Sequence, residues 1–199
     1  FFFIVGFPIL FLLSGCGNSA NHVPDVSNIK INLQTFRFDK DLYSIDTNNI
    51  GPGLHRLKQR YPDFLDYYLD TIRAYGIHSH YDDTGKSIND LRIDLTYKDF
   101  VDLQNSIDKQ YPDAKTTDQA LESGFKLIKY YLPDYNIPRI YYLNMGLSKW
   151  PSFPVDQHTL CIGLDMFLGD DFPQYEDLGV AGYMAGHFRP GCVPVSLLC

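Results

Sequence analysis

The chain has few cysteines and none of the short motifs that identify common enzymes. Its four cysteines are Cys16, Cys161, Cys192 and Cys199, and they form no Cys-x-x-Cys pair. This excludes a zinc ribbon and a thioredoxin-type redox motif. The HExxH, GxSxG, GxGxxG and Walker A patterns are also missing, so no motif points to a catalytic class.

Positive charge is scarce as well. The 17 Lys and Arg residues are outnumbered by 24 Asp and Glu residues, and the formal net charge is -7. This balance argues against nucleic acid as a partner. With 45% hydrophobic and 21% charged residues, the chain is neither disordered nor a multi-span membrane protein. Its 199 residues can form one domain with a sizeable core.

The longest apolar run lies at the very start of the sequence. Phe1–Leu13 is too short to span a bilayer and fits the apolar region of a signal peptide. It ends in Leu12–Cys16, a Leu-Leu-Ser-Gly-Cys segment of the kind that bacterial lipoprotein signal peptidase cleaves. We therefore expect Cys16 to become the mature N-terminus and to carry a lipid anchor in the membrane. The alternative is a core helix with a buried cysteine.

This interpretation divides the chain into three parts. Because the sequence begins with Phe1 and not with methionine, we expect residues 1–15 to be a partial lipoprotein signal peptide. Residues 16–28 are small and polar and are predicted to form a flexible tether. Residues 29–199 are predicted to form a single α+β domain in the cell envelope, either facing the periplasm or on the outer surface. Disulfides are permitted there.

Hydrophobic periodicity predicts mainly helices in the first two thirds of this domain. The exception is its start, where apolar residues alternate with polar ones from Ile29 to Phe38 and predict a strand with a bulge near Gln34. Helices are expected over four segments, and residues 88–95 are ambiguous between helix and strand. The expected helices lie at about residues 46–61, 62–76, 97–111 and 116–132. In the last of them, Thr116 and Gln119 have the spacing of a capping box.

Two β-branched and aromatic runs follow these helices. Residues 137–143 and 159–164 are predicted strands, and the second is apolar on both faces, as a central strand would be. Residues 144–158 are expected to join them as a hairpin-like excursion. The fold class is therefore predicted to be α+β, with helices packed on a small mixed or antiparallel sheet.

Candidate catalytic or metal-binding residues are few. His78 and His80 point the same way if their segment is extended, and could then share a metal ion. Asp165, Asp170 and Asp171 supply oxygen ligands, but without the spacing of an EF-hand. We interpret the histidines as part of a solvated loop and the aspartates as a strand end and loop surface, with no metal or cofactor.

The cysteines other than Cys16 have no predicted catalytic role. Cys161 lies within an apolar strand and is expected to be a buried small hydrophobic residue. Cys192 and Cys199 are close enough in sequence to close a small disulfide loop, and the sequence leaves both their free and their paired states open.

Several segments, in their order along the chain, resemble the gliding motility-associated lipoprotein GldB of Bacteroidota. They are Phe36–Asp46, Leu57–Phe64, Tyr130–Pro133 with Ile137–Pro138, and Ile162–Gly169. The resemblance implies a membrane-anchored accessory component of gliding motility and of the associated type IX protein secretion. Its partners would be other envelope proteins of that machinery, and neither catalysis nor nucleic acid binding is implied.

The same resemblance carries two further expectations. The family looks distantly like zincin peptidases, so the scaffold would be zincin-like and the alternative function is a zinc-dependent peptidase or its inactive remnant. Family members are longer, so we expect the domain to be truncated at its C-terminus, near Cys199. A third alternative is a solute-binding lipoprotein that uses its many aromatic residues, which are 15% of the chain, although we expect these residues to form the core.

Overall fold

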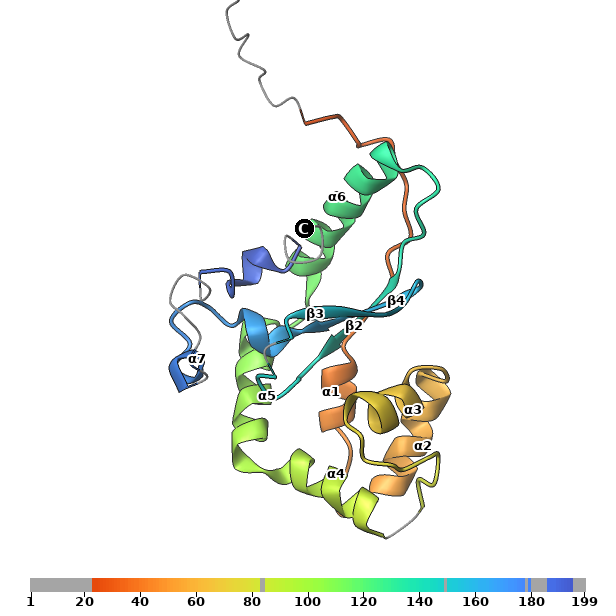
Figure 1. The fold of residues 1–199 in the computed structure, drawn as a ribbon, viewed down its shortest axis with the longest axis vertical. Coiled ribbons are helices and arrows are strands. Elements are labelled where there is room, and N and C mark those ends of the chain that lie inside the picture. Colours follow the sequence, from red (N-terminus) through yellow and green to blue (C-terminus); the bar gives the residue numbers. More distant parts are fainter. Residues whose placement is uncertain (1–22, 83–84, 149, 178, 180–185, 195–199) are drawn as a thin grey trace, which may run out of the picture.

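The fold is α+β, as predicted, with helices on both sides of a small mixed sheet (Figure 1). This computed structural model describes residues 23–82, 85–148, 150–177, 179 and 186–194. Three of the sequence predictions lie outside these residues: the signal peptide, Cys16 and a Cys192–Cys199 disulfide, since Cys199 is not among them.

The described sheet has four strands in the order β1-β2-β4-β3. They are β1 (Thr35–Phe36), β2 (Arg139–Leu143), β3 (Ser152–Asp156) and β4 (Thr159–Gly163). The strands β1, β2 and β4 are parallel, and β3 runs antiparallel to β4. The sheet is therefore mixed, and β4 lies inside it, as its apolar sequence predicted.

The predicted hairpin between the two C-terminal strands is wrong. Tyr141 pairs with Cys161 in parallel register, so the chain must cross back before it enters β4. The true hairpin joins β3 to β4, and its tight turn includes a hydrogen bond from the His158 amide to Asp156 Oδ1 at 2.6 Å. The prediction failed because no local pattern distinguishes the two pairings.

The N-terminal strand is shorter than its alternation predicted. Ile29, Ile31 and Leu33 are half-buried and their neighbours are exposed, so the predicted two-residue alternation is present. Only β1 joins the sheet, however, where the Ile140 amide donates to Gln34 O at 2.8 Å. Phe38 belongs to the short helix α1 (Phe38–Tyr43), which the sequence analysis did not predict.

The longer predicted helices are confirmed, with shifted ends. They are α2 (Ile50–Arg60), the α3 and η1 pair (Leu65–Tyr67 and the π-helical Tyr68–Ile72), α5 (Lys98–Gln110) and α6 (Lys115–Tyr131). The ambiguous segment is a helix, α4 (Lys86–Thr96).

The predicted capping box of α6 is wrong. The N-cap of α6 is Ala114 in a left-handed conformation, which places Thr116 inside the first turn. Three short helices follow in the described part of the C-terminal region: η2 (Leu164–Phe167), α7 (Gln174–Asp177) and η3 (Pro190–Cys192).

The two faces of the sheet bury two different hydrophobic clusters. Tyr141 and Leu143 of β2 face a cluster that is built mainly by α1 to α4. Ile140 and Tyr142 face a cluster to which α5, α6, η2 and the C-terminal segment contribute. This alternation along β2 is the two-residue period of a strand that is buried on both sides. The sheet is therefore the element on which the two halves of the core depend.

Half of the tyrosines that the structure describes are buried in the core, in line with the prediction that the aromatic residues form the core. Tyr61, Tyr68 and Tyr141 are buried with Phe64 in the first cluster. The rings of Phe64 and Tyr141 are stacked, with centroids 3.9 Å apart. This aromatic packing on the sheet contributes hydrophobic area and ring contacts rather than a binding surface for solutes.

Candidate functional site

Polar side chains gather at the edge where the three parallel strands end. Asp39 follows β1, Asn144 follows β2 and Asp165 follows β4, and all three are buried. The carboxyl ends of parallel strands meet at one edge, which is where α/β sheets usually bind ligands. Together with Arg37 and with Gln104 of α5, these residues are called here the carboxyl-edge cluster.

Asp165 has the most unusual environment in this cluster. Its side chain is completely buried in η2. One carboxylate oxygen accepts the amide of Met145 at 3.1 Å and the other accepts the amide of Leu147 at 2.6 Å. Burial raises the pKa of Asp165 to about 6, although these amides favour the charged form. The carboxylate thus fixes the turn after β2, where Gly146 and Leu147 have positive φ angles.

Asn144 and Gln104 connect this turn to the start of the domain. The Asn144 side chain accepts the Gly146 amide at 3.1 Å and donates to Gln104 Oε1 at 3.3 Å. The Gln104 amide in turn donates to Asp39 Oδ2 at 3.1 Å. A helix on one side of the sheet is thereby tied to two of the parallel strands through side chains alone.

Arg37 completes the cluster by pairing with Asp39. Its Nε and Nη2 atoms donate to the two Asp39 carboxylate oxygens at 2.8 and 2.6 Å. The same guanidinium donates to Asp108 of α5 and to the Tyr111 carbonyl. A planar guanidinium suits this bidentate geometry, and a buried carboxylate such as Asp39 needs such a partner.

The geometry of the carboxyl-edge cluster supports a structural role. Asp39 and Asp165 have almost no solvent exposure, and both oxygens of each accept hydrogen bonds from within the chain. Over the described parts of the chain, no buried side-chain nitrogen or oxygen is without a hydrogen-bond partner. The buried carboxylates of this edge are therefore used in contacts within the chain. A pocket of about 460 Å³ lies next to them and is lined by Gly146 and Leu147 of the turn after β2 and by Leu103 of α5, among other residues.

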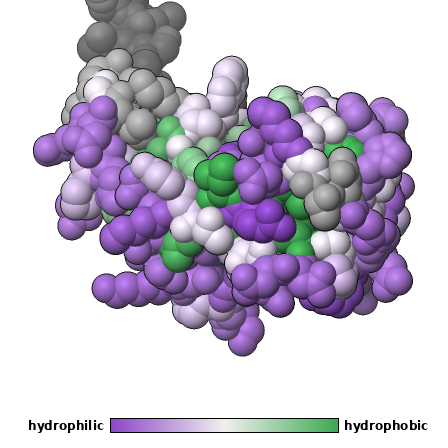
Figure 2. Space-filling model, turned by 90° about the horizontal axis from the view of Figure 1, so that it is seen from below, coloured by the Kyte–Doolittle hydropathy of each residue, from purple (hydrophilic) through white to green (hydrophobic). Residues whose placement is uncertain are grey.

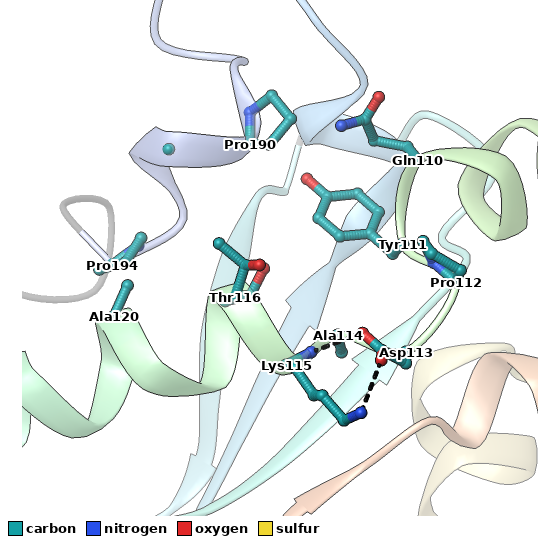
Figure 3. A pocket seen from close by; sticks show the side chains of 12 residues that line it. Gln110, Tyr111, Pro112, Asp113, Ala114, Lys115, Thr116, Ala120, Pro190 and Pro194 are labelled. Carbon is teal, nitrogen blue, oxygen red and sulfur yellow. Dashed lines mark hydrogen bonds and ion pairs between the residues drawn. The ribbon is translucent and has the colours of Figure 1, made fainter.

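A pocket of about 350 Å³ lies nearby, between the start of α6 and the C-terminal segment (Figure 3). Gln110 and Tyr111 form one part of its wall, and Pro190 belongs to η3 across from them. Thr116 and Ala120 line it from α6. The lining is mainly small or apolar.

Three of the polar residues around this pocket, Tyr111, Asp113 and Lys115, form contacts within the chain. The Tyr111 hydroxyl donates to the Phe167 carbonyl at 2.6 Å. Burial raises the pKa of this hydroxyl well above its usual value. Lys115 forms an ion pair with Asp113 at 3.1 Å. These contacts hold the connection between α5 and α6 in place, and they assemble neither a nucleophile with its base nor a set of metal ligands.

The two histidines considered as metal ligands lie on an exposed loop. His78 and His80 are both exposed, and His78 Nδ1 lies 3.5 Å from Asp70 Oδ2. Asp70 also accepts the backbone amides of Ile77 and His78. In the described chain, no three His, Cys, Asp or Glu side chains are grouped so as to hold a metal ion.

The structure separates the three aspartates that were grouped by sequence. Asp165 is buried, so its interpretation as a surface residue is wrong; the chain turns inward as it leaves β4 and directs this carboxylate at backbone amides. Asp170 instead forms an ion pair with Arg189, and Asp171 is exposed.

Cys161 is fully buried in β4, as predicted, and burial raises the pKa of its thiol, which disfavours the reactive thiolate. Cys192 is half-buried.

The sequence analysis missed most of the carboxyl-edge cluster. Arg37, Asp39, Gln104 and Asn144 were not singled out, because polar residues beside short strands are common. One signal was available, namely a polar residue directly after each predicted strand. Its use would have required the parallel pairing, which the sequence analysis did not predict.

Comparison with known proteins identifies a family. The profile described as gliding motility protein GldB matches residues 19–198, which is nearly the whole chain. Searches of curated proteins and of solved structures return no match, and nothing links the chain to zincin peptidases. Within the described residues, no helix is both long enough and apolar enough to cross a membrane. The chain therefore belongs to the GldB family of gliding motility lipoproteins.

Proposed function

We propose that this protein is held in the cell envelope by a lipid on Cys16 and serves there as an accessory component of gliding motility and type IX secretion. It acts outside the cytoplasm by binding other envelope proteins, and it is not an enzyme. The observation that carries this proposal is the family match over residues 19–198, together with the Leu12–Cys16 segment, which is separated from its start by two residues.

The internal contacts support a role in binding. The parallel-strand edge, where an enzyme of this architecture would hold its substrate, is occupied by the paired residues Arg37, Asp39 and Asp165. An interaction protein requires only a stable scaffold with an accessible surface.

Replacing Cys16 in the native gene tests the proposal. We expect Cys16→Ser to abolish palmitate labelling, to move the protein from the membrane to the soluble fraction, and to reduce both colony spreading and secretion of type IX cargo. The half-buried Cys192 provides a matched control, because Cys192→Ser removes a thiol without affecting a lipid site. A Cys16→Ser protein that remains in the membrane would contradict the anchor.

The mode of action has a separate test. Metal analysis of the purified wild-type protein should find no stoichiometric zinc. Affinity purification from cross-linked membranes should recover envelope proteins with the wild type. Stoichiometric zinc together with peptide hydrolysis would overturn the accessory role in favour of an enzyme.

A further inference from the structure

An aromatic patch lies at the end of α6. It consists of Tyr130, Tyr131, Leu132 and Tyr135, whose exposed fractions are 50%, 66%, 59% and 38%. The Tyr130 and Tyr131 rings contact each other at 5.0 Å between centroids, and Tyr135 is stacked on Phe125. These four large side chains are close together in sequence and are all exposed at or just after the end of α6. Such a grouping of exposed apolar residues indicates an interaction site.

The predicted tether leaves the domain at this same end. Ile31 and Leu33 pack against the cluster that also holds Ile128, in the last turns of α6. From there the chain runs past the end of α6 toward Val23, as the upper part of Figure 1 shows. The sequence from Cys16 to Val23 spans at most about 25 Å when fully extended. A lipid on Cys16 would therefore keep this end of the molecule close to the bilayer.

The opposite end of the molecule has a different surface. Seen from below in Figure 2, the face around α4 is mostly hydrophilic, although Ile93 of α4 and the adjacent Tyr97 are 50% and 53% exposed. Ion pairs such as Lys86–Asp90 lie on this side. The chain that leads to the tether therefore passes the end of α6, where the aromatic patch is exposed, and not the end that carries α4.

The chemistry of the patch fits a lipid surface. Tyrosine has an apolar ring with a polar tip, and it is enriched where proteins meet the interface between lipid and water. Lys129, whose ammonium donates to the Pro133 carbonyl, lies on the rim of the patch. A groove of about 550 Å³ adjoins Tyr135 and is lined by Phe125, Phe153 and Leu160 among other residues. Its apolar wall extends the patch along the sheet edge.

We propose that this patch is a second membrane contact, which inserts its tyrosine and leucine side chains into the bilayer interface and orients the domain on the membrane. The inference rests on the lipid anchor of the proposed function. Tethering makes the second contact intramolecular, so a weak interaction suffices to keep it formed. The carboxyl edge of the sheet then faces away from the membrane.

The single native tryptophan supplies a matched reporter. Trp150 is 64% exposed, and its carbonyl lies beside Gly163 at the carboxyl end of β4, the end of the strand away from the patch. A second reporter is made in a Trp150→Phe background by Tyr131→Trp, at a position that is 66% exposed and therefore tolerant of substitution. Each protein then contains one indole, at one end of the sheet or at the other.

Both lipidated full chains are reconstituted into vesicles of phosphatidylethanolamine and phosphatidylglycerol with brominated acyl chains. We expect the indole at position 131 to show a blue-shifted emission and strong quenching, and Trp150 to show neither. An anchored protein whose position 131 is not quenched would overturn the inference and leave the anchor intact. Equal quenching at both positions would also overturn it, because the domain would then not be oriented by the patch.

A second arm separates failure of the anchor from failure of the patch. Unlipidated Cys16→Ser chains are titrated with the same vesicles, with and without the paired changes Tyr130→Ser and Leu132→Ser. We expect weak binding that these changes reduce by about tenfold or more, since each removes apolar area from the interface. Binding that is unchanged by them would contradict the inference. A position 131 that is shielded from acrylamide in the brominated vesicles but is unquenched by their lipid would also contradict the inference, because protein would then cover the patch.

Discussion

The two ends of the sheet differ in how the chain uses them. At the carboxyl edge, Asp39, Asn144 and Asp165 are buried, and the side chain of each forms hydrogen bonds with other groups of the chain. At the opposite end, next to the amino end of β2, Tyr131 and Leu132 are exposed. The comparison shows that the buried polar side chains at the edge where ligands usually bind are paired within the chain, while large apolar side chains at the other end are exposed and available for contact with a surface.

The largest loss of stability is expected from Arg37→Ala at the filled edge. This change leaves the buried Asp39 carboxylate without its bidentate partner, and should lower the free energy of unfolding by about 3 kcal/mol. Arg60→Ala is the control, because Arg60 pairs with Asp41 at the surface and should cost only about 0.5 kcal/mol. Urea unfolding measures both. Equal effects of the two changes would mean that the carboxyl-edge cluster does not stabilise the fold.

A pH-dependent effect of up to the same size is expected at Asp165. Its pKa is raised from 3.8 to about 6 in the folded protein, so the folded state binds the proton more tightly than the unfolded state. The resulting stabilisation is present below about pH 4 and is lost as the pH rises through about 6. Relative to Asp165→Asn, which keeps a neutral side chain, the wild type should therefore lose up to about 3 kcal/mol across this window. Unfolding of both proteins at several pH values tests this, and a constant difference would show that the carboxyl does not titrate there.

An intermediate loss is expected in the middle of the sheet. The buried Tyr142 donates its hydroxyl to Asp118 Oδ1 of α6 at 2.7 Å. Tyr142→Phe removes this bond and should cost about 1 to 2 kcal/mol, because the acceptor is charged. Tyr97→Phe removes a hydroxyl from a side chain that is 53% exposed and serves as the control. If the two changes shift the thermal midpoint equally, the link between β2 and α6 does not contribute to stability.

The smallest effect on stability is expected at the open end. Tyr131→Ser replaces a side chain that is 66% exposed, and should change the free energy of unfolding by no more than about 0.5 kcal/mol. Chemical denaturation of the soluble Cys16→Ser chain measures this change. A loss of several kcal/mol would mean that the patch belongs to the core, and would remove the contrast between the two ends.

Local sequence patterns predicted the helices well and the pairing of strands badly. The spacing of Leu121, Phe125 and Ile128 was enough to place α6, because helical hydrogen bonds join residues close in sequence. The parallel pairing of Tyr141 with Cys161 joins residues that are separated by a whole excursion of the chain, and no local pattern encodes it. The same limit explains why the carboxyl-edge cluster was missed, since its members come from distant segments.

The sequence by itself determined the helical stripes, the buried character of Cys161 and the family, and it predicts the lipid anchor on Cys16. All of these depend on residues that are neighbours in the chain or on their order along it. Only the tertiary structure decided that Asp165 is buried and that Tyr131 is exposed beside the path of the tether. Burial is a property of which segments meet in space, and the sheet decides this by bringing β1, β2 and β4 into parallel register.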